Sequence, residues 1–154
     1  MVDVVLSRMV HLFVAALWAG SVVYVAWVVL PLARDGAFSR TEPLAVLMGR
    51  LRTLSRASAV ILLLTGGHLA AAAYTADSLL ETTNGQLVLA MTALWLVLIG
   101  LVEVATARFD RGLDEEMLRS PAHETITLFR AAAVVAIVVM LVAGAISANA
   151  VQVL

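Results

Sequence analysis

Two histidines of this 154-residue chain lie inside long apolar stretches, where an imidazole can ligate a metal. Trp18 follows His11 by seven residues, which places both on one face of a helix. His68 follows Gly66 and Gly67, and small residues let a second backbone or a flat cofactor approach closely. Neutral imidazole binds haem iron and copper. The pattern predicts cofactor binding by His11, His68, Trp18 and Gly67, and hydrogen bonding to water, lipid or protein is the alternative for each histidine.

The identity of the metal is left open between haem b and copper, and a chain without any cofactor is the third possibility. We expect His68 near the middle of its span and His11 about 12 Å further outward, which disfavours one haem between both imidazoles. Thioethers suit Cu(I), so Met9 and Met91 are candidate ligands if the metal is copper. Met9 and His11 are two residues apart and do not share a helix face.

Gln86 and Glu103 are further polar residues within the apolar stretches, where such groups usually face a neighbouring helix or a cavity. We expect Glu103 to pair with Arg108 or to reach the membrane interface, and a proton relay is the alternative. No residue is assigned a catalytic role. The chain has no Cys and no Lys, which excludes disulfides, thiolate metal sites and Schiff-base chemistry. Its net charge of −1 argues against nucleic-acid binding.

The composition predicts an integral membrane protein, because 62% of the residues are apolar and only 14% are charged. A membrane span needs about 20 mostly apolar residues, and lipid offers the backbone no hydrogen-bond partners. The sequence therefore predicts an all-α, up-down-up-down four-helix bundle that forms a single membrane domain. Its expected spans are residues 6–32, 56–76, 85–107 and 130–152.

The distribution of arginine predicts the orientation in the plasma membrane. Nine of the ten arginines lie in residues 31–56 and 108–130 or at their edges. The positive-inside rule places these loops in the cytoplasm and both termini outside. Within the first loop, Thr41-Glu42-Pro43 resembles a helix start, so we expect the second helix to begin near Leu44.

An internal duplication of residues 1–77 and 78–154 is a further expectation. A shift of 77 residues aligns Ala16-Leu17-Trp18 with Ala93-Leu94-Trp95. The histidines are not repeated by this shift, since His11 falls on Val88 and His68 on Ala145. A histidine site would therefore belong to the first half alone.

The opening His11-x6-Trp18-Ala-Gly20, with a helix ending at Leu30-Pro31, resembles the copper-resistance D (CopD) membrane proteins. Leu64-Thr65-Gly66 and the polar start Asn84-Gly85-Gln86-Leu87 also resemble that family, over nearly the whole chain. The resemblance implies a transition metal or haem in the outer half of the bundle, bound by His11. It implies copper handling and transport, or membrane electron transfer.

The same opening also resembles the HemJ-type haem-binding membrane proteins, which are associated with porphyrinogen oxidation. That activity is disfavoured, because the family is expected to use a Lys where this chain has Gln86. Whether the protein is an enzyme is left open. A cofactor-free accessory subunit of a membrane complex is another alternative, with the lipid bilayer and a homo-oligomer or larger complex as expected partners.

Overall fold

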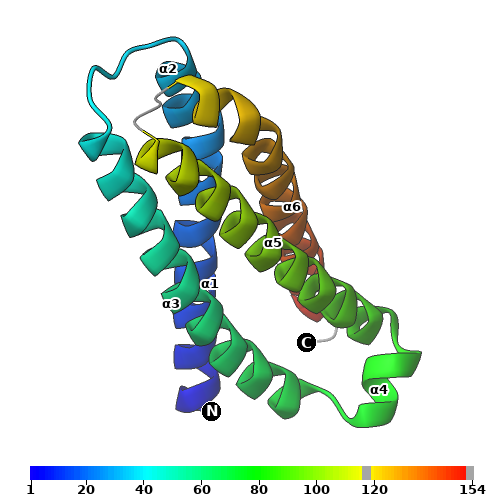
Figure 1. Ribbon diagram of the computed structural model, residues 1–154. Helices are drawn as coiled ribbons and strands as arrows, with labels where there is room; N and C mark the ends of the chain where they lie inside the picture. The colour runs from blue at the N-terminus through cyan, green and yellow to red at the C-terminus, as the bar shows by residue number, and fades with distance from the viewer. Residues whose placement is uncertain (116–118, 152–154) are drawn as a thin grey trace.

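The computed structural model describes residues 1–115 and 119–151, and within them four helices are long and apolar enough to cross a membrane (Figure 1). This confirms the predicted all-α four-span architecture. The first span is continuous from Val2 to Arg34 and consists of α1 (Val2–Tyr24), the π-helical segment η1 (Val25–Val29) and α2 (Leu30–Arg34). The other spans are α3 (Glu42–Ala73), α5 (Thr83–Asp114) and α6 (Arg119–Val151).

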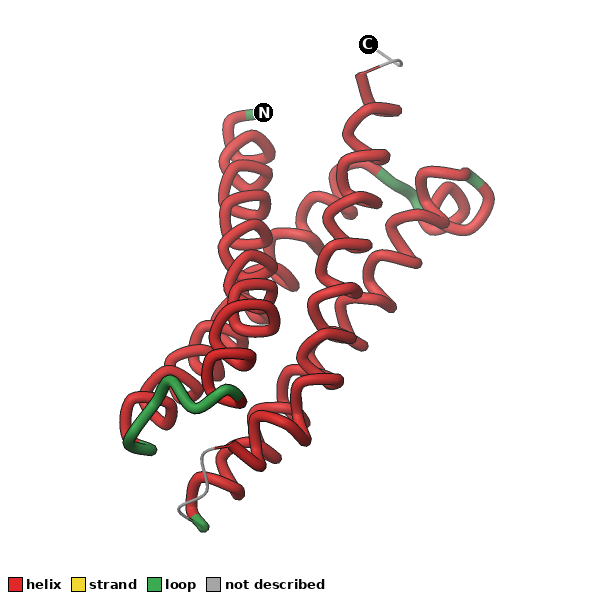
Figure 2. Tube along the Cα trace, turned by 90° about the horizontal axis from the view of Figure 1, so that it is seen from above, coloured by secondary structure: helices red, strands yellow, loops and turns green. Residues whose placement is uncertain are grey.

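Successive spans run in opposite directions and pack as two hairpins. The most extensive contacts join α1 to α3 and α5 to α6, and contacts of α1 with α6 and of α3 with α5 join the hairpins. Figure 2 shows the start of α1 at the end of the bundle opposite the loop that joins α2 to α3. We call the end with the start of α1 and with α4 (Ala76–Glu81) the termini end, and the opposite end the arginine end.

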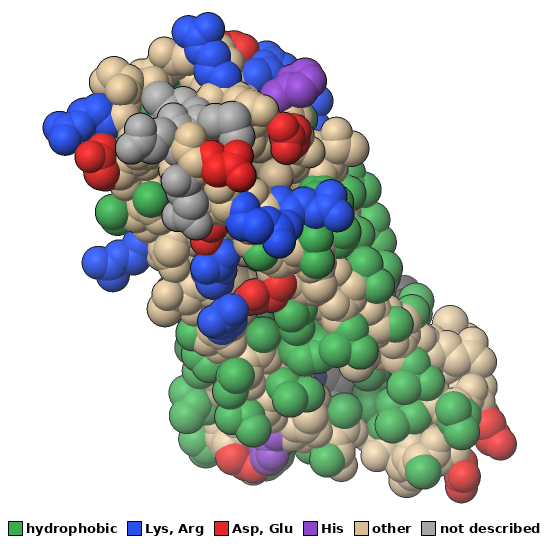
Figure 3. All heavy atoms as spheres, in the orientation of Figure 1, with side chains coloured by type: hydrophobic (Ala, Val, Ile, Leu, Met, Phe, Trp, Pro, Cys, Tyr) green, Lys and Arg blue, Asp and Glu red, His purple; other side chains and the backbone are tan. Residues whose placement is uncertain are grey.

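The arginine end extends beyond the expected spans. α3 begins at Glu42 with Pro43 in its first turn, which confirms the predicted helix start. Thr41 precedes this helix but does not cap it, because its backbone is already helical and its side chain accepts no capping hydrogen bond. On the face in Figure 3, arginine and acidic side chains gather at this end, and hydrophobic side chains cover most of the termini half.

The first span continues through Pro31, so the expected helix end at Leu30-Pro31 is wrong. Proline has no N–H to donate to the carbonyl four residues earlier, and its ring crowds that carbonyl. The wider π-helical turn of Val25–Val29 directly precedes this position, and the Leu30 N–H bonds to the Val25 carbonyl across it. The span then ends at Arg34, and Gly36 follows with a φ of 83°, a left-handed conformation that suits glycine.

The connection between α3 and α5 contains a short helix, α4 (Ala76–Glu81), which lies outside the predicted spans. In α4, the Thr75 hydroxyl accepts a hydrogen bond from the Ser78 N–H, and the Ser78 hydroxyl accepts one from the Thr75 N–H. This reciprocal pair is a capping box in which serine replaces the usual glutamate. It fixes the turn from α3 to α5 at the termini end.

The hydrophobic core occupies the arginine half of the bundle. Buried hydrophobic side chains run from Val14 to Ala33 in the first span, Leu44 to Leu62 in α3, Leu98 to Leu113 in α5, and Ala122 to Ala136 in α6. The hydrophobic side chains nearer the termini end are only partly buried or exposed. The bundle therefore has a closely packed half and a more open half.

Candidate metal site

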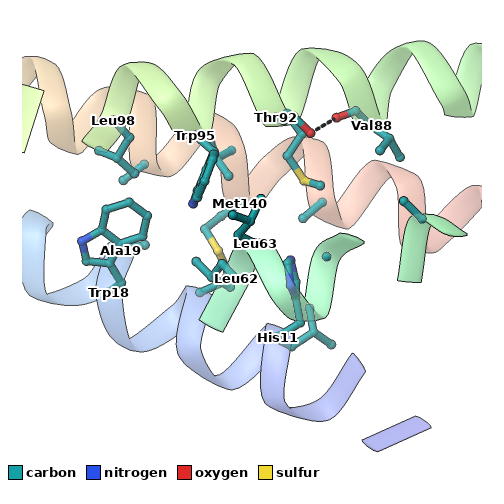
Figure 4. Close-up of a pocket in the computed structure, with 18 of the residues that line it drawn as sticks. His11, Trp18, Ala19, Leu62, Leu63, Val88, Thr92, Trp95, Leu98 and Met140 are labelled. Carbon is teal, nitrogen blue, oxygen red and sulfur yellow. Dashed lines mark hydrogen bonds between the residues drawn. The ribbon is translucent and has the colours of Figure 1, made fainter. Parts of the chain in front are cut away.

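A cavity of about 200 Å³ lies between the four spans, directly on the termini side of the packed core. All four spans line it. It lies beside the core, since His11 precedes the first core residue of α1 and Gly66 follows the last core residue of α3. Trp95 comes from α5 and Met140 from α6. Figure 4 shows the side chains of His11, Trp95 and Met140 turned toward this shared space. The cavity is therefore where the two halves of the bundle meet.

His11 is fixed by a hydrogen bond across two spans. Its Nδ1 lies 2.8 Å from the Thr65 hydroxyl oxygen. The Thr65 hydroxyl in turn donates to the Ile61 carbonyl at 2.7 Å. Since a hydroxyl has one proton, the oxygen of Thr65 accepts and we assign the imidazole proton to Nδ1. The lone pair of the neutral ring is then on Nε2, for which no hydrogen bond is found among the described residues.

Gly66 lets the imidazole pack directly against α3. A Cβ atom at this position would lie 3.0 Å from His11 Cε1, closer than side chains normally tolerate. A Cβ at Gly67 would meet nothing within 4 Å, although Gly67 also lines the cavity. The close approach expected of the two glycines therefore occurs at Gly66, against a side chain of the neighbouring span.

Trp95 contributes a polar group without a protein partner. Its Nε1 is buried and has no hydrogen-bond partner among the described residues. Buried N–H groups without a partner are rare, because such a group loses its hydrogen bond to water without replacement. Thr92, whose side chain also lines the cavity, already donates its hydroxyl proton to the Val88 carbonyl. Within the described residues, the cavity thus offers His11 Nε2 as an acceptor and Trp95 Nε1 as a free donor.

Two methionines line the cavity together with His11. Met91 was a candidate from the sequence, and Met140 was missed because α6 carries no polar residue beside it that would mark the position. Met9 was also a candidate, but it is 64% exposed and does not line the cavity. Its separation from His11 by two residues places it on another face of α1.

His68 lies outside this cavity. Its Nε2 is 3.4 Å from a carboxylate oxygen of Asp3, in the first turn of α1, and its side chain is 45% exposed. The expected position near the middle of the span is wrong, since α3 ends at Ala73, only five residues after His68. The structure thus places His68 nearer the termini end than His11, which lies beside Thr65, so the expected outward offset of His11 is also wrong.

Trp18 has a structural partner in the packed core. Its ring borders the cavity, and its Nε1 donates to the Ser55 hydroxyl oxygen at 2.8 Å. The side chain is 2% exposed. This bond joins α1 to α3 where the cavity meets the packed core. It directs the indole N–H away from the cavity.

A family model, described as copper resistance protein D, matches residues 45–150. The chain belongs to the CopD family. The four apolar helices and this membership make it a multi-pass membrane protein related to copper resistance. No curated protein and no solved structure matches the chain.

The CopD match covers α3, α5 and α6, three of the four spans that line the cavity, because it begins within α3 and reaches the last turns of α6. Thr65, Met91, Trp95 and Met140 lie within it. His11 lies in the first span, outside the match, so its place in the site rests on the geometry of this chain.

Glu103 belongs to an ion pair that joins α3 to α5 in this CopD protein. Both carboxylate oxygens accept hydrogen bonds from the Arg56 guanidinium at 2.9 Å, and Arg52 pairs with Asp110 nearby. The expected pairing of Glu103 with Arg108 is wrong, because residues five apart on a helix point in different directions. Gln86 donates to the Leu80 carbonyl at 3.0 Å and so fastens α5 to α4.

The described residues contain no group of three or more His, Asp or Glu side chains that could hold a metal. His123 is exposed near the start of α6, far along the chain from the cavity residues. A metal site in the described part of the chain would therefore combine His11 with ligands of another chemical type.

Proposed function

We propose that the protein binds one Cu(I) ion as cargo in the cavity between its four spans, as part of copper handling in the membrane. The ligands in this proposal are His11 Nε2 and the thioether sulfurs of Met91 and Met140. The observation that carries it is the meeting of one imidazole and two methionines, from three spans, in one apolar cavity. Membership of the copper resistance protein D family supports the choice of metal.

The ligand chemistry favours Cu(I) over harder cations. Thioether and imidazole groups are soft or intermediate ligands that suit Cu(I), whereas carboxylates and carbonyls suit Mg²⁺ and Ca²⁺. Among the described residues, no Asp or Glu lines the cavity. A site of three neutral ligands also suits a singly charged ion better than a doubly charged one, because the cost of charge burial rises with charge.

The His11–Thr65 bond supports metal binding by His11. Metal-ligating histidines usually donate their second ring N–H to an oxygen acceptor, which fixes both tautomer and ring orientation. Thr65 provides this acceptor at 2.8 Å, on a hydroxyl whose own proton is used by Ile61. The imidazole therefore needs no change of tautomer to present Nε2 to an ion.

Trp95 supplies a donor for a fourth group on the ion. Its buried Nε1–H can donate to a water or halide that completes the coordination. This water or halide would accept the hydrogen bond that Trp95 Nε1–H otherwise lacks.

Haem b fits the described site poorly. The cavity of about 200 Å³ is smaller than most ligand pockets, which measure about 300–1,000 Å³. The second histidine is bonded to Asp3 and does not line the cavity, so a ring held between His11 and His68 has no support. We therefore propose copper rather than haem.

The orientation that we propose follows from the positive-inside rule. The arginine end faces the cytoplasm of a plasma membrane and the termini end faces outward. The cavity then lies on the outer side of the packed core, which blocks direct passage to the cytoplasm. In this state the protein takes up Cu(I) from the outer side, and onward transfer requires the core to open.

A Cu(I) competition titration of the detergent-purified protein, under anaerobic reducing conditions with a colorimetric chelator, tests the proposal. We expect one bound Cu(I) per chain in the wild type. His11→Ala should abolish binding, and Met91→Leu and Met140→Leu should each weaken it, because leucine keeps the volume but removes the sulfur. Helix content from circular dichroism shows that each variant is folded.

His68→Ala and Met9→Leu are the matched controls, since both residues lie outside the cavity lining. We expect them to bind Cu(I) as the wild type does. Wild-type binding in His11→Ala, or no binding of Cu(I) by the folded wild type, would refute the proposal. The second result would favour a cofactor-free accessory subunit.

A further inference from the structure

A groove on the outside of the bundle, in the arginine half, is separate from the cavity. It has a volume of about 840 Å³ and runs between the first span and α3. Small residues open it, namely Ala16 and Gly20 on one side and Ala57 on the other. A Cβ at Gly20 would meet nothing within 4 Å, so this part of the groove is empty space beside the helix. In a membrane, lipid chains are the molecules that reach such a surface.

The serine and threonine hydroxyls of the groove bond to their own helices. Ser21 donates to the Leu17 carbonyl at 2.8 Å, and Thr53 donates to the Gly49 carbonyl at 3.0 Å. Leucines, alanines and Val25 make up most of the remaining lining. The Arg50 guanidinium and the Tyr24 hydroxyl are therefore the groups that could hold a polar ligand there.

Arg50 is exposed and has no ion-pair partner among the described residues. Four other arginines of the same end each pair with a carboxylate, and these are Arg34, Arg40, Arg52 and Arg56. No Asp or Glu of the described part of the chain lines the groove. The groove thus carries one positive charge without compensation, and an anionic group would be complementary to it.

The position of Arg50 in α3 matches the level of lipid headgroups. It lies seven residues, about 10 Å, before Ala57, where the uncharged part of α3 begins. The groove continues from Arg50 to the level of Ala16 and Ala57. A phosphate beside Arg50 would therefore continue into an acyl chain along the apolar part of the groove.

We propose that this groove is a binding site for one anionic phospholipid, with its phosphate at Arg50 and an acyl chain along Gly20 and Ala57. Basic side chains beside grooves between membrane helices attract anionic headgroups, and each contributes about 1 kcal/mol at a membrane surface. The site is independent of copper binding, because it shares no lining residue with the cavity.

Native mass spectrometry of the detergent-purified protein, with added phosphatidylglycerol or phosphatidylcholine of identical acyl chains, tests this site. We expect the wild type to retain phosphatidylglycerol preferentially. Arg50→Gln should weaken phosphatidylglycerol binding about fivefold, which corresponds to about 1 kcal/mol, and should leave phosphatidylcholine binding unchanged. Arg50→Lys keeps the charge and should retain most of the preference. Gly20→Leu fills the groove and should weaken the binding of both lipids.

Two matched controls separate this site from general surface charge and bulk. Arg108 is also exposed and unpaired among the described residues, and Gly100 is also open to substitution, but neither lines the groove. Arg108→Gln and Gly100→Leu should bind both lipids as the wild type does. The proposal is overturned if Arg50→Gln keeps the full preference, or if Arg108→Gln loses as much.

Discussion

The His11 imidazole lies 2.8 Å from the Thr65 hydroxyl and so joins the first span to the second. Because this hydroxyl gives its proton to Ile61, the bond fixes the ring with Nε2 as its free nitrogen. Thr65 is a positioning residue in our proposal, since it would act on the metal only through His11. The first prediction concerns this bond.

Thr65→Val should weaken Cu(I) binding about 10–100-fold, the usual cost of losing a hydrogen-bond partner of a metal-bound histidine. Valine matches the shape of threonine but cannot accept the Nδ1 proton. Thr65→Ser restores the oxygen and should restore most of the affinity, as measured by chelator competition. Thr92→Val is the control, because the Thr92 hydroxyl bonds only to the Val88 carbonyl. Wild-type affinity in Thr65→Val would show that the bond does not position a metal ligand.

Gly66→Ala should weaken Cu(I) binding by about tenfold, on the scale of other changes around a metal-bound histidine. The new methyl group would lie 3.0 Å from His11 Cε1, so the imidazole must shift by a few tenths of an ångström. Gly67→Ala is the adjacent control, because its methyl group meets nothing within 4 Å. The chelator titration of both variants should separate them, and equal affinities would contradict a fixed His11.

Trp18→Phe should destabilise the protein by about 1–3 kcal/mol, because the Ser55 hydroxyl is buried and loses its donor. Unfolding by sodium dodecyl sulfate in mixed micelles, followed by circular dichroism, measures this loss. The double variant Trp18→Phe/Ser55→Ala should recover part of it, since both polar groups are then removed. Purely additive losses would contradict a coupled pair. Cu(I) affinity should change little, because the indole N–H points away from the cavity.

Glu103→Gln should lower the melting temperature slightly and leave Cu(I) affinity unchanged. The carboxylate receives two hydrogen bonds from Arg56, but Arg56 is exposed and Glu103 is partly exposed, so solvent screens the pair. Arg56→Gln should produce a similar loss, and the double variant should lose less than the sum of both. A loss of copper binding in Glu103→Gln would instead favour a role for Glu103 in the site.

The four spans could be predicted because membrane helices follow from local composition. Their ends were less predictable, since the π-helical turn before Pro31 and the capping box of α4 depend on particular backbone hydrogen bonds. The duplication of residues 1–77 and 78–154 stays a prediction, as do the orientation and the oligomeric state.

The candidate site was only partly predictable, because it depends on which helix faces meet. His11 and Met91 stood out by residue type, and both line the cavity. His68 stood out equally, yet α3 ends too soon to bring it inward, and it meets Asp3 instead. Met140 is surrounded by aliphatic residues in the sequence, so only the packing of α6 against the other spans identifies it.

The ligand set itself is tested most directly by X-ray absorption spectroscopy at the copper edge of the Cu(I)-loaded protein. We predict an edge typical of Cu(I), with two sulfur scatterers and one imidazole nitrogen in the first shell, beside the water or halide that Trp95 would hold. The imidazole contribution should persist in His68→Ala and disappear in His11→Ala. A first shell of nitrogen and oxygen alone, or an imidazole signal that survives in His11→Ala, would contradict the proposed site.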